Sequence, residues 1–299
     1  MAVDALRTPD DRFQALPDWD CAPHYVDDLP GYEGLRVHYA DEGPADAPVF
    51  LCLHGQPAWA YLYRKMMPVF LRSGARVVAP DWLGFGRSDK PVDDAVYGFN
   101  FQRDMMIALI ERLDLTRVTL VVQDWGGILG LTLPMDMPGR IDRVLVMNTA
   151  LVVGKWPGQG FLDWRAYVAA NPDMDCARLM ARASPVLTPA EAQAYSAPFP
   201  DIRYKAGMRR FPQMVMTDPG MEGVDLSMRA VRFFQNDWQG DSFMAIGMQD
   251  PVLGPPVMAR LHAIIRNCPP PLEVAEAGHF VQEWGAPVAE AALRHWGDV

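Results

Sequence analysis

The residues with the clearest chemical potential are Asp124 and its neighbours. An apolar run that ends at Val122 leads through Gln123 into Asp124, and the glycines Gly126 and Gly127 follow. A strand that turns tightly into a helix exposes one side chain above a sheet, as nucleophile elbows do. The pattern departs from G-x-S-x-G because Val122 stands at the first glycine position and Asp124 at the serine position. The glycines allow the close approach of strand and helix that this turn requires.

An aspartate at this position changes the chemistry that the turn can perform. A carboxylate is ionised at neutral pH, so it needs no base to attack a saturated carbon and form an ester. A histidine is then required only to activate water against that ester. The turn alone leaves a second interpretation open, in which Asp124 caps the following helix, as aspartates often do.

Partners for such a nucleophile follow later in the chain, in the order nucleophile, acid, histidine. His279 follows the last apolar run, so we expect it at the carboxyl end of a strand. The acid has two possible positions, each after a predicted strand: one carries Asn148 and the other Asp250. Because only a carboxylate can stabilise an imidazolium by charge, we select Asp250. Its alternative role is that of an ordinary turn aspartate.

An oxyanion site is expected after an earlier apolar run, in the segment HGQP. The backbone N–H groups of Gln56 and Trp125 would face the ester oxygen as it becomes negative. Backbone donors have no side-chain signature, so position in the motif carries this assignment.

The elements that must position these residues are strands and helices in alternation. Short runs rich in Val and Leu, separated by helical stretches, predict an α/β fold with a mostly parallel sheet covered on both faces. The alternation of predicted strands and helices is interrupted between Met147 and Phe243, where the sequence is rich in Pro, Met and aromatic residues. We predict a hydrolase core at 1–150 and 233–299, with a helical cap at 151–232 over the carboxyl ends of the strands. Thr188 and Glu191 form a capping box that begins one cap helix.

Composition excludes several classes of function. The net charge of -10 argues against nucleic-acid binding, which needs clustered Lys and Arg. No uncharged apolar run is long enough to span a bilayer. The start MAVDALRTPDDRF lacks the apolar region of a signal peptide. Four scattered cysteines without a CxxC pair are typical of reduced thiols, so we expect a cytoplasmic protein with no metal site.

With these residues in place, the chain resembles the haloalkane dehalogenases of the α/β-hydrolase superfamily, and among them the subfamily typified by the dichloroethane-degrading enzyme of Xanthobacter. The resemblance extends over nearly the full length. It is carried by the segments HGQPAWAYLYRKM, DWLGFGRSDKP, VVQDWGGILGLTLPM, YSAPFPDIRYKAGMRRFP and NDWQGDSFMAIGMQDPVLG. The HG-x-P and DWGG pieces also occur in epoxide hydrolases, whereas the cap segment and GMQD are more specific.

The resemblance implies an eight-stranded sheet and assigns roles to named residues. It makes Asp124 the nucleophile, His279 the base and Asp250 the acid. It also makes Trp125 and Trp164 the two halide ligands, whose indole N–H groups can donate but not accept.

The resemblance further implies hydrolysis of small haloalkanes to alcohol, halide and a proton, without a metal or organic cofactor. We expect the halide to be a product ligand and the protein to be a monomer or small homo-oligomer. The expected pocket walls are Phe161, Ile128, Val252 and Leu253.

Two residues depart from the subfamily pattern. Gln56 stands where the type member has glutamate, and its amide leaves the number of halide ligands open. Ile128 is aliphatic where a phenylalanine wall is expected, which leaves the preferred substrate size open.

Two other functions are compatible with parts of the pattern. An epoxide hydrolase shares the nucleophile and the histidine pair, and it would need an acid such as Tyr167, Tyr195 or Tyr204 in the cap. A ligand receptor on a hydrolase fold would be free to lose Asp124, His279 or Asp250, and the chain retains all three.

Overall fold

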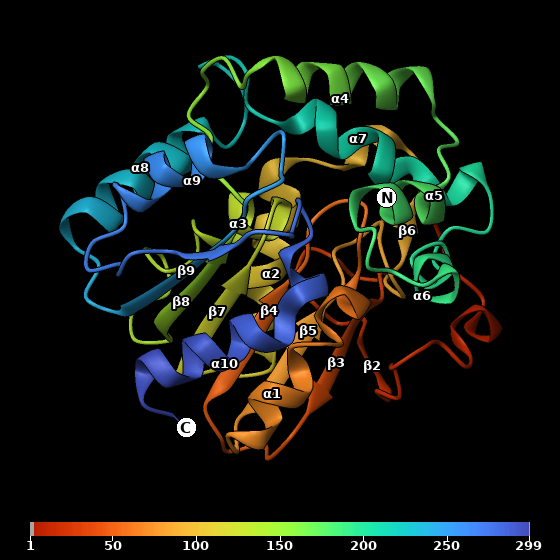
Figure 1. The fold of residues 1–299 in the computed structure, drawn as a ribbon. Helices are drawn as coiled ribbons and strands as arrows, with labels where there is room; N and C mark the ends of the chain where they lie inside the picture. The colour runs from red at the N-terminus through yellow and green to blue at the C-terminus, as the bar shows by residue number, and fades with distance from the viewer. Residues whose placement is uncertain (1–2, 299) are drawn as a thin grey trace.

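An eight-stranded sheet forms the centre of the computed structural model, which describes residues 3–298 (Figure 1). The strand order is β10-β9-β8-β7-β4-β5-β3-β2. The six strands from β10 to β5 pair in parallel, whereas β3 pairs antiparallel with both β5 and β2. The strands are β2 (Pro23–Val26), β3 (Val37–Glu42), β4 (Val49–Leu53), β5 (Arg76–Pro80), β7 (Val118–Val122), β8 (Ile141–Met147), β9 (Asp241–Gly247) and β10 (Leu272–Val274).

The central strands are those that the apolar runs predict. Every residue of β4 and β7 is buried, as parallel strands covered on both faces must be. The antiparallel pair β2 and β3 does not follow from the residue pattern, because β2 has only 4 residues and Val26 alone of them is buried. A second, two-stranded sheet joins β1 (Ala5–Leu6) to β6 (Lys90–Pro91).

Helices cover the two faces of the sheet (Figure 1). The helices α1 and α10 pack together in front of the strands, and α2 packs with α3, which contacts β4 and β7. The core helices are α1 (Met67–Arg72), α2 (Phe99–Arg112), α3 (Trp125–Gly130), α9 (Pro255–His262) and α10 (Gly285–Trp296). Single 3-10 turns are η1 (Asp10–Phe13), η2 (Ala60–Tyr63), η3 (Asp94–Val96), η4 (Ile202–Lys205) and η5 (Val281–Trp284).

The helices between β8 and β9 lie mostly above the carboxyl ends of the strands (Figure 1). They are α4 (Gln159–Ala170), α5 (Cys176–Ala183), α6 (Pro189–Ala194), α7 (Ala206–Met214) and α8 (Val224–Asn236). The capping box of Thr188 and Glu191 is present at the start of α6. The predicted cap boundary at 232 falls inside α8, whose Phe234 carbonyl accepts the N–H of Arg266 from the core.

A buried ion cluster joins the cap to the core. Arg64, which follows η2, donates to both carboxylate oxygens of Glu283 at 2.8 Å. It also donates to Glu191 of α6 at 2.7 Å. The Tyr195 hydroxyl contacts Glu283 as well. The Arg64 and Glu283 side chains have no exposed surface. Their contacts with Glu191 and Tyr195 therefore fix the cap against the segment that follows His279.

Membrane spans, disulfides and metal clusters are absent from the part of the chain that the structure describes. No helix between residues 3 and 298 is both long and apolar enough to cross a bilayer. The four cysteines are unpaired. Within the same span, no group of three or more His, Cys, Asp or Glu side chains is arranged to hold a metal ion.

Candidate active site

The turn between β7 and α3 holds Asp124 in a strained backbone conformation. Its φ of 49° and ψ of -125° are rare for a residue with a side chain. A Cβ on Gly126 would lie 1.9 Å from the carbonyl oxygen of Leu53, so only glycine fits against β4 there. The Asp124 N–H donates to the carbonyl of Asn148 at 2.9 Å, and the Thr149 hydroxyl donates to the Asp124 carbonyl at 2.7 Å. The sharp turn therefore has its backbone groups satisfied.

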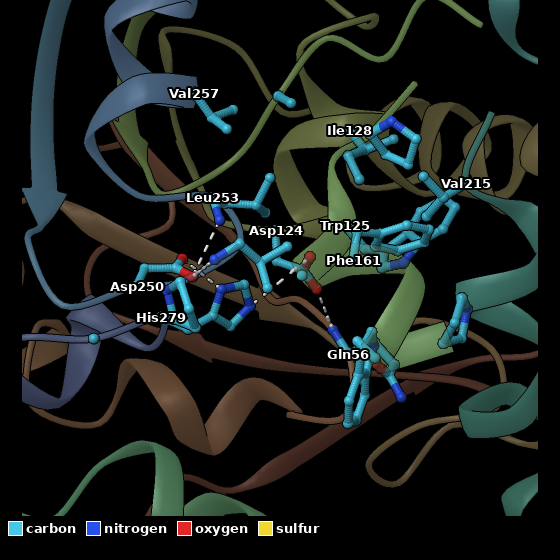
Figure 2. Close-up of a pocket in the computed structure, with 18 of the residues that line it drawn as sticks. Gln56, Asp124, Trp125, Ile128, Phe161, Val215, Asp250, Leu253, Val257 and His279 are labelled. Atoms are coloured by element: carbon cyan, nitrogen blue, oxygen red, sulfur yellow. Dashed lines mark hydrogen bonds and ion pairs between the residues drawn. The ribbon is translucent and has the colours of Figure 1, made fainter. Parts of the chain in front are cut away.

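The Asp124 carboxylate lies against the loop that follows β4. Its Oδ2 accepts the backbone N–H of Gln56 at 2.8 Å (Figure 2). Gly55 makes this approach possible, because a Cβ there would lie 2.5 Å from Oδ2. Burial raises the pKa of Asp124, whereas His279 and the backbone N–H groups of Gln56 and Trp125 lower it. The net direction is upward, and the two N–H groups are those predicted for the oxyanion site.

His279 lies between two carboxylates (Figure 2). Its Nδ1 is 2.8 Å from Asp250 Oδ2, and its Nε2 is 3.9 Å from Asp124 Oδ1. Burial lowers the pKa of His279, but the charges of Asp250 and Asp124 outweigh burial and raise this pKa to about 9. The Asp250 contact leaves Nε2 as the ring nitrogen that faces Asp124.

Asp250 is held in place by three donors besides the histidine. Its Oδ1 accepts the backbone N–H groups of Val252 and Leu253 at 2.8 and 3.1 Å. Its Oδ2 accepts the side-chain amide of Asn148 at 3.0 Å. Burial raises the pKa of Asp250, but His279, Asn148 and the Val252 N–H lower it to about 2. The carboxylate is therefore charged at neutral pH.

Two neighbours of the site are absent from the residues predicted for it. Asn148 is the position not selected for the acid, and its side chain links Asp250 to β9 through the N–H and carbonyl of Gly247. Gln123 is predicted only as part of the turn, yet its amide nitrogen is 3.0 Å from both Nε2 and the carbonyl oxygen of His279. Both residues follow a buried strand directly, and a polar residue at that position is the one sequence signal that could have indicated them.

A cavity of about 1120 Å³ opens above Asp124, between the core and the cap. It is lined by every residue predicted for the site: Asp124, His279, Asp250, Trp125, Trp164, Gln56, Phe161, Ile128, Val252 and Leu253. Lys155, Arg182 and Arg260 also line it. The structure thus brings the predicted residues together, with an aliphatic wall at Ile128.

The two predicted halide ligands come from different parts of the fold. Trp125 begins α3, and its ring packs edge-on against Phe211 of the cap at 4.9 Å. Trp164 lies on α4 and stacks against Tyr167 with ring centroids 5.9 Å apart. Within residues 3–298, neither indole N–H has a hydrogen-bond acceptor, so both donors remain available to a ligand.

The Gln56 side chain points toward the cap. Its amide nitrogen donates to the carbonyl of Met208 in α7 at 3.2 Å. Gln56 therefore contacts Asp124 through its backbone and the cap through its side chain, and one hydrogen of its side-chain amide is already donated.

Comparisons with known proteins agree on one family. Residues 48–286 match the family model of the alpha/beta hydrolase fold. A haloalkane dehalogenase of Psychrobacter cryohalolentis is 40% identical, over 93% of each chain. One of Mycolicibacterium paratuberculosis is 36% identical, over 97% of each chain. The solved structure of the haloalkane dehalogenase DpaA from Paraglaciecola agarilytica is 51% identical over 98% of each chain, with a TM-score of 0.96.

The chain belongs to the haloalkane dehalogenase family. Its function is therefore hydrolytic dehalogenation, as the resemblance implied, and its α/β-hydrolase fold is confirmed. These comparisons do not distinguish the Xanthobacter subfamily, which stays a prediction.

The structure does not support the epoxide hydrolase interpretation, because the cap tyrosines that would act as proton donors do not gather at the cavity. Of the three cap tyrosines considered as proton donors, only Tyr167 lines the cavity within the described residues. Tyr195 is fully buried and contacts Glu283, and Tyr204 packs against the core. A paired set of tyrosines facing the nucleophile is therefore missing from the described part of the cavity.

Proposed function

We propose that this dehalogenase works through a covalent ester on Asp124. The observation that carries the proposal is the convergence, in one cavity, of the Asp124 carboxylate, two indoles with unused N–H groups and the Nε2 of His279. Asp124 Oδ2 is already occupied by the N–H of Gln56, which leaves Oδ1 as the attacking oxygen. The carbon–oxygen bond forms as the carbon–halogen bond breaks, and the electron pair leaves with the halide.

The departing halide needs stabilisation but no proton. The indole N–H groups of Trp125 and Trp164 donate to the growing negative charge beside the apolar walls of the cavity. These walls, at Phe161, Ile128, Val252 and Leu253, hold the alkyl chain. We propose no metal or organic cofactor for this step, since the nucleophile is ionised and the leaving group is stable as an anion.

The ester is then hydrolysed by water. His279 Nε2 takes a proton from a water molecule, whose oxygen attacks Cγ of Asp124. Asp250 stabilises the imidazolium, and the N–H groups of Gln56 and Trp125 hold the ester oxygen as it becomes negative. Collapse releases the alcohol and restores the carboxylate, and the imidazolium returns its proton to solvent.

Replacement of the base tests the covalent intermediate. The His279→Gln variant still carries the nucleophile, so a reactive bromoalkane should add one alkyl group to Asp124 and the ester should persist. Mass spectrometry of the digested protein locates the added mass. An inert protein, or alkyl mass on another peptide, would remove Asp124 from this role.

We also propose a small homo-oligomer and a small halogenated substrate. The DpaA relative has a tetrameric structure, and the two chains are 51% identical. Light scattering coupled to gel filtration measures the mass in solution. A mass of 33.4 kDa at all concentrations would mean a monomer.

A further inference from the structure

The Gln123 side chain is placed to act on the catalytic base. It has no exposed surface and follows β7 directly, one residue before the nucleophile. Its amide nitrogen lies 3.0 Å from Nε2 of His279 and donates to the backbone carbonyl of the same residue, also at 3.0 Å. One NH₂ group thus contacts both the Nε2 atom and the backbone carbonyl oxygen of His279.

The orientation of this amide is fixed by the carbonyl. A carbonyl oxygen can only accept, so the atom of Gln123 that faces it must be the NH₂ group. Rotation of the amide would bring its oxygen against the oxygen of His279. The NH₂ group therefore presents its second hydrogen toward Nε2, and Nε2 can accept it only when that nitrogen carries no proton.

The charges around His279 act in the opposite direction. Asp250, from the loop after β9, and Asp124, from the turn after β7, both favour the protonated ring. Glu276 lines the same cavity three residues earlier in the chain, but it is not among the groups that act on the ring. Formation of the ester removes the charge of Asp124, so Asp250 and Gln123 then act on the ring without it.

We propose that Gln123 is a positioning residue that keeps Nε2 of His279 unprotonated and directed at the ester in the alkyl-enzyme. This inference rests on the proposed function, because it concerns the hydrolysis of that ester. The attacking water gives its proton to Nε2, and Nε2–H then faces the fixed NH₂ group of Gln123. That contact favours transfer of the proton from the ring to solvent and so restores the base.

The test is the pH profile of ester hydrolysis in Gln123→Met, which keeps the length of the side chain and removes the donor. Hydrolysis needs the unprotonated ring, so its rate falls below the apparent pKa of the base. Loss of the donor should raise that pKa and move the acid limb upward by about 0.5 to 1 pH unit. Rapid quenching with mass detection of the alkyl-enzyme measures this step apart from alkylation.

Gln282→Met is the matched control. Gln282 is also a fully buried glutamine close to His279 in the chain, and it makes no hydrogen bond with the ring in the described structure. Its variant should retain the acid limb of the parent enzyme. An unshifted limb in Gln123→Met, with an ester that forms normally, would overturn the inference alone. Absence of any ester in the parent enzyme would instead overturn the proposed function.

A second measurement needs no change at Gln123. In Asp124→Ala, position 124 carries neither a charge nor a hydrogen-bond donor, and nitrogen NMR of labelled histidine reports the protonation of each ring nitrogen. At neutral pH we expect Nδ1 to carry the proton, with the Nε2 resonance displaced by an accepted hydrogen bond. A protonated Nε2, or an Nε2 resonance typical of a nitrogen without a donor, would contradict the assignment.

Discussion

The Asp250→Asn substitution should stop the reaction at the ester, for a reason that lies in the hydrogen bonds of Asp250. Its Oδ1 accepts two backbone N–H groups, those of Val252 and Leu253, at 2.8 and 3.1 Å. In the variant the amide oxygen must occupy this position, because an NH₂ group cannot face two donors. The NH₂ group therefore takes the place of Oδ2, 2.8 Å from Nδ1 of His279.

That exchange reverses the tautomer of the base. The new NH₂ group donates to Nδ1, so the proton of the neutral ring moves to Nε2, and the ring can no longer accept a proton from water. It also faces the Asn148 amide, which is a donor 3.0 Å from the present Oδ2. An aspartate-to-asparagine change of this kind costs about 10⁴-fold in rate, or about 5 kcal/mol in the barrier.

Single-turnover kinetics with a bromoalkane separate the two steps. Bromide release should continue, because alkylation needs no base, while alcohol formation should slow about 10⁴-fold and the alkyl-enzyme should accumulate. Glu276→Gln is the control, since it removes a carboxylate from the same cavity without a contact to His279. Alcohol formation by Asp250→Asn within tenfold of the parent rate would refute the tautomer argument.

Two further outcomes test the halide site and the link between cap and core. Trp164→Phe removes one N–H donor to an anion, so bromide should bind about tenfold to hundredfold more weakly in a fluorescence-quenching titration; unchanged affinity would exclude Trp164 from the site. Arg64→Ala leaves Lys65, 3.0 Å from the buried Glu283 carboxylate, as its remaining cationic partner and should lower the free energy of unfolding by about 3 kcal/mol in urea titrations. The exposed Arg72→Ala control should change this free energy by less than about 0.5 kcal/mol, and an equal loss in both variants would contradict the role of the cluster.

The residues proposed as the main catalytic groups can be predicted from the sequence because their signals are local. Asp124 sits where an apolar strand meets two glycines, and His279 follows the last apolar run of the core. The capping box at Thr188 is equally readable, since its two partners are three residues apart. The cap is recognisable as a helical insertion, but its predicted boundary at 232 falls within α8, because amphipathic helices of cap and core have the same periodicity.

The contacts that tune the site could not be predicted in the same way. Asn148 binds Asp250 across 102 positions of the chain, and Gln123 binds His279 across 156. No local pattern specifies which amide will meet which loop, because that depends on strand order. The hydrogen bond from Gln56 to Met208 likewise depends on how the cap packs against the core.

Strand order explains why these distant residues form one site. The sheet runs β10-β9-β8-β7-β4, and each of these parallel strands is followed at its carboxyl end by polar residues of the site: His279 after β10, Asp250 after β9, Asn148 after β8, Gln123 and Asp124 after β7, and Gln56 after β4. Neighbouring strands thus place the proposed base beside the proposed acid, that acid beside its amide partner, and the proposed nucleophile beside its predicted oxyanion donor. Asp81, which follows β5 one strand further, does not line the cavity. The chemistry is therefore fixed by the order in which the strands pair, which is a property that no single segment of the sequence contains.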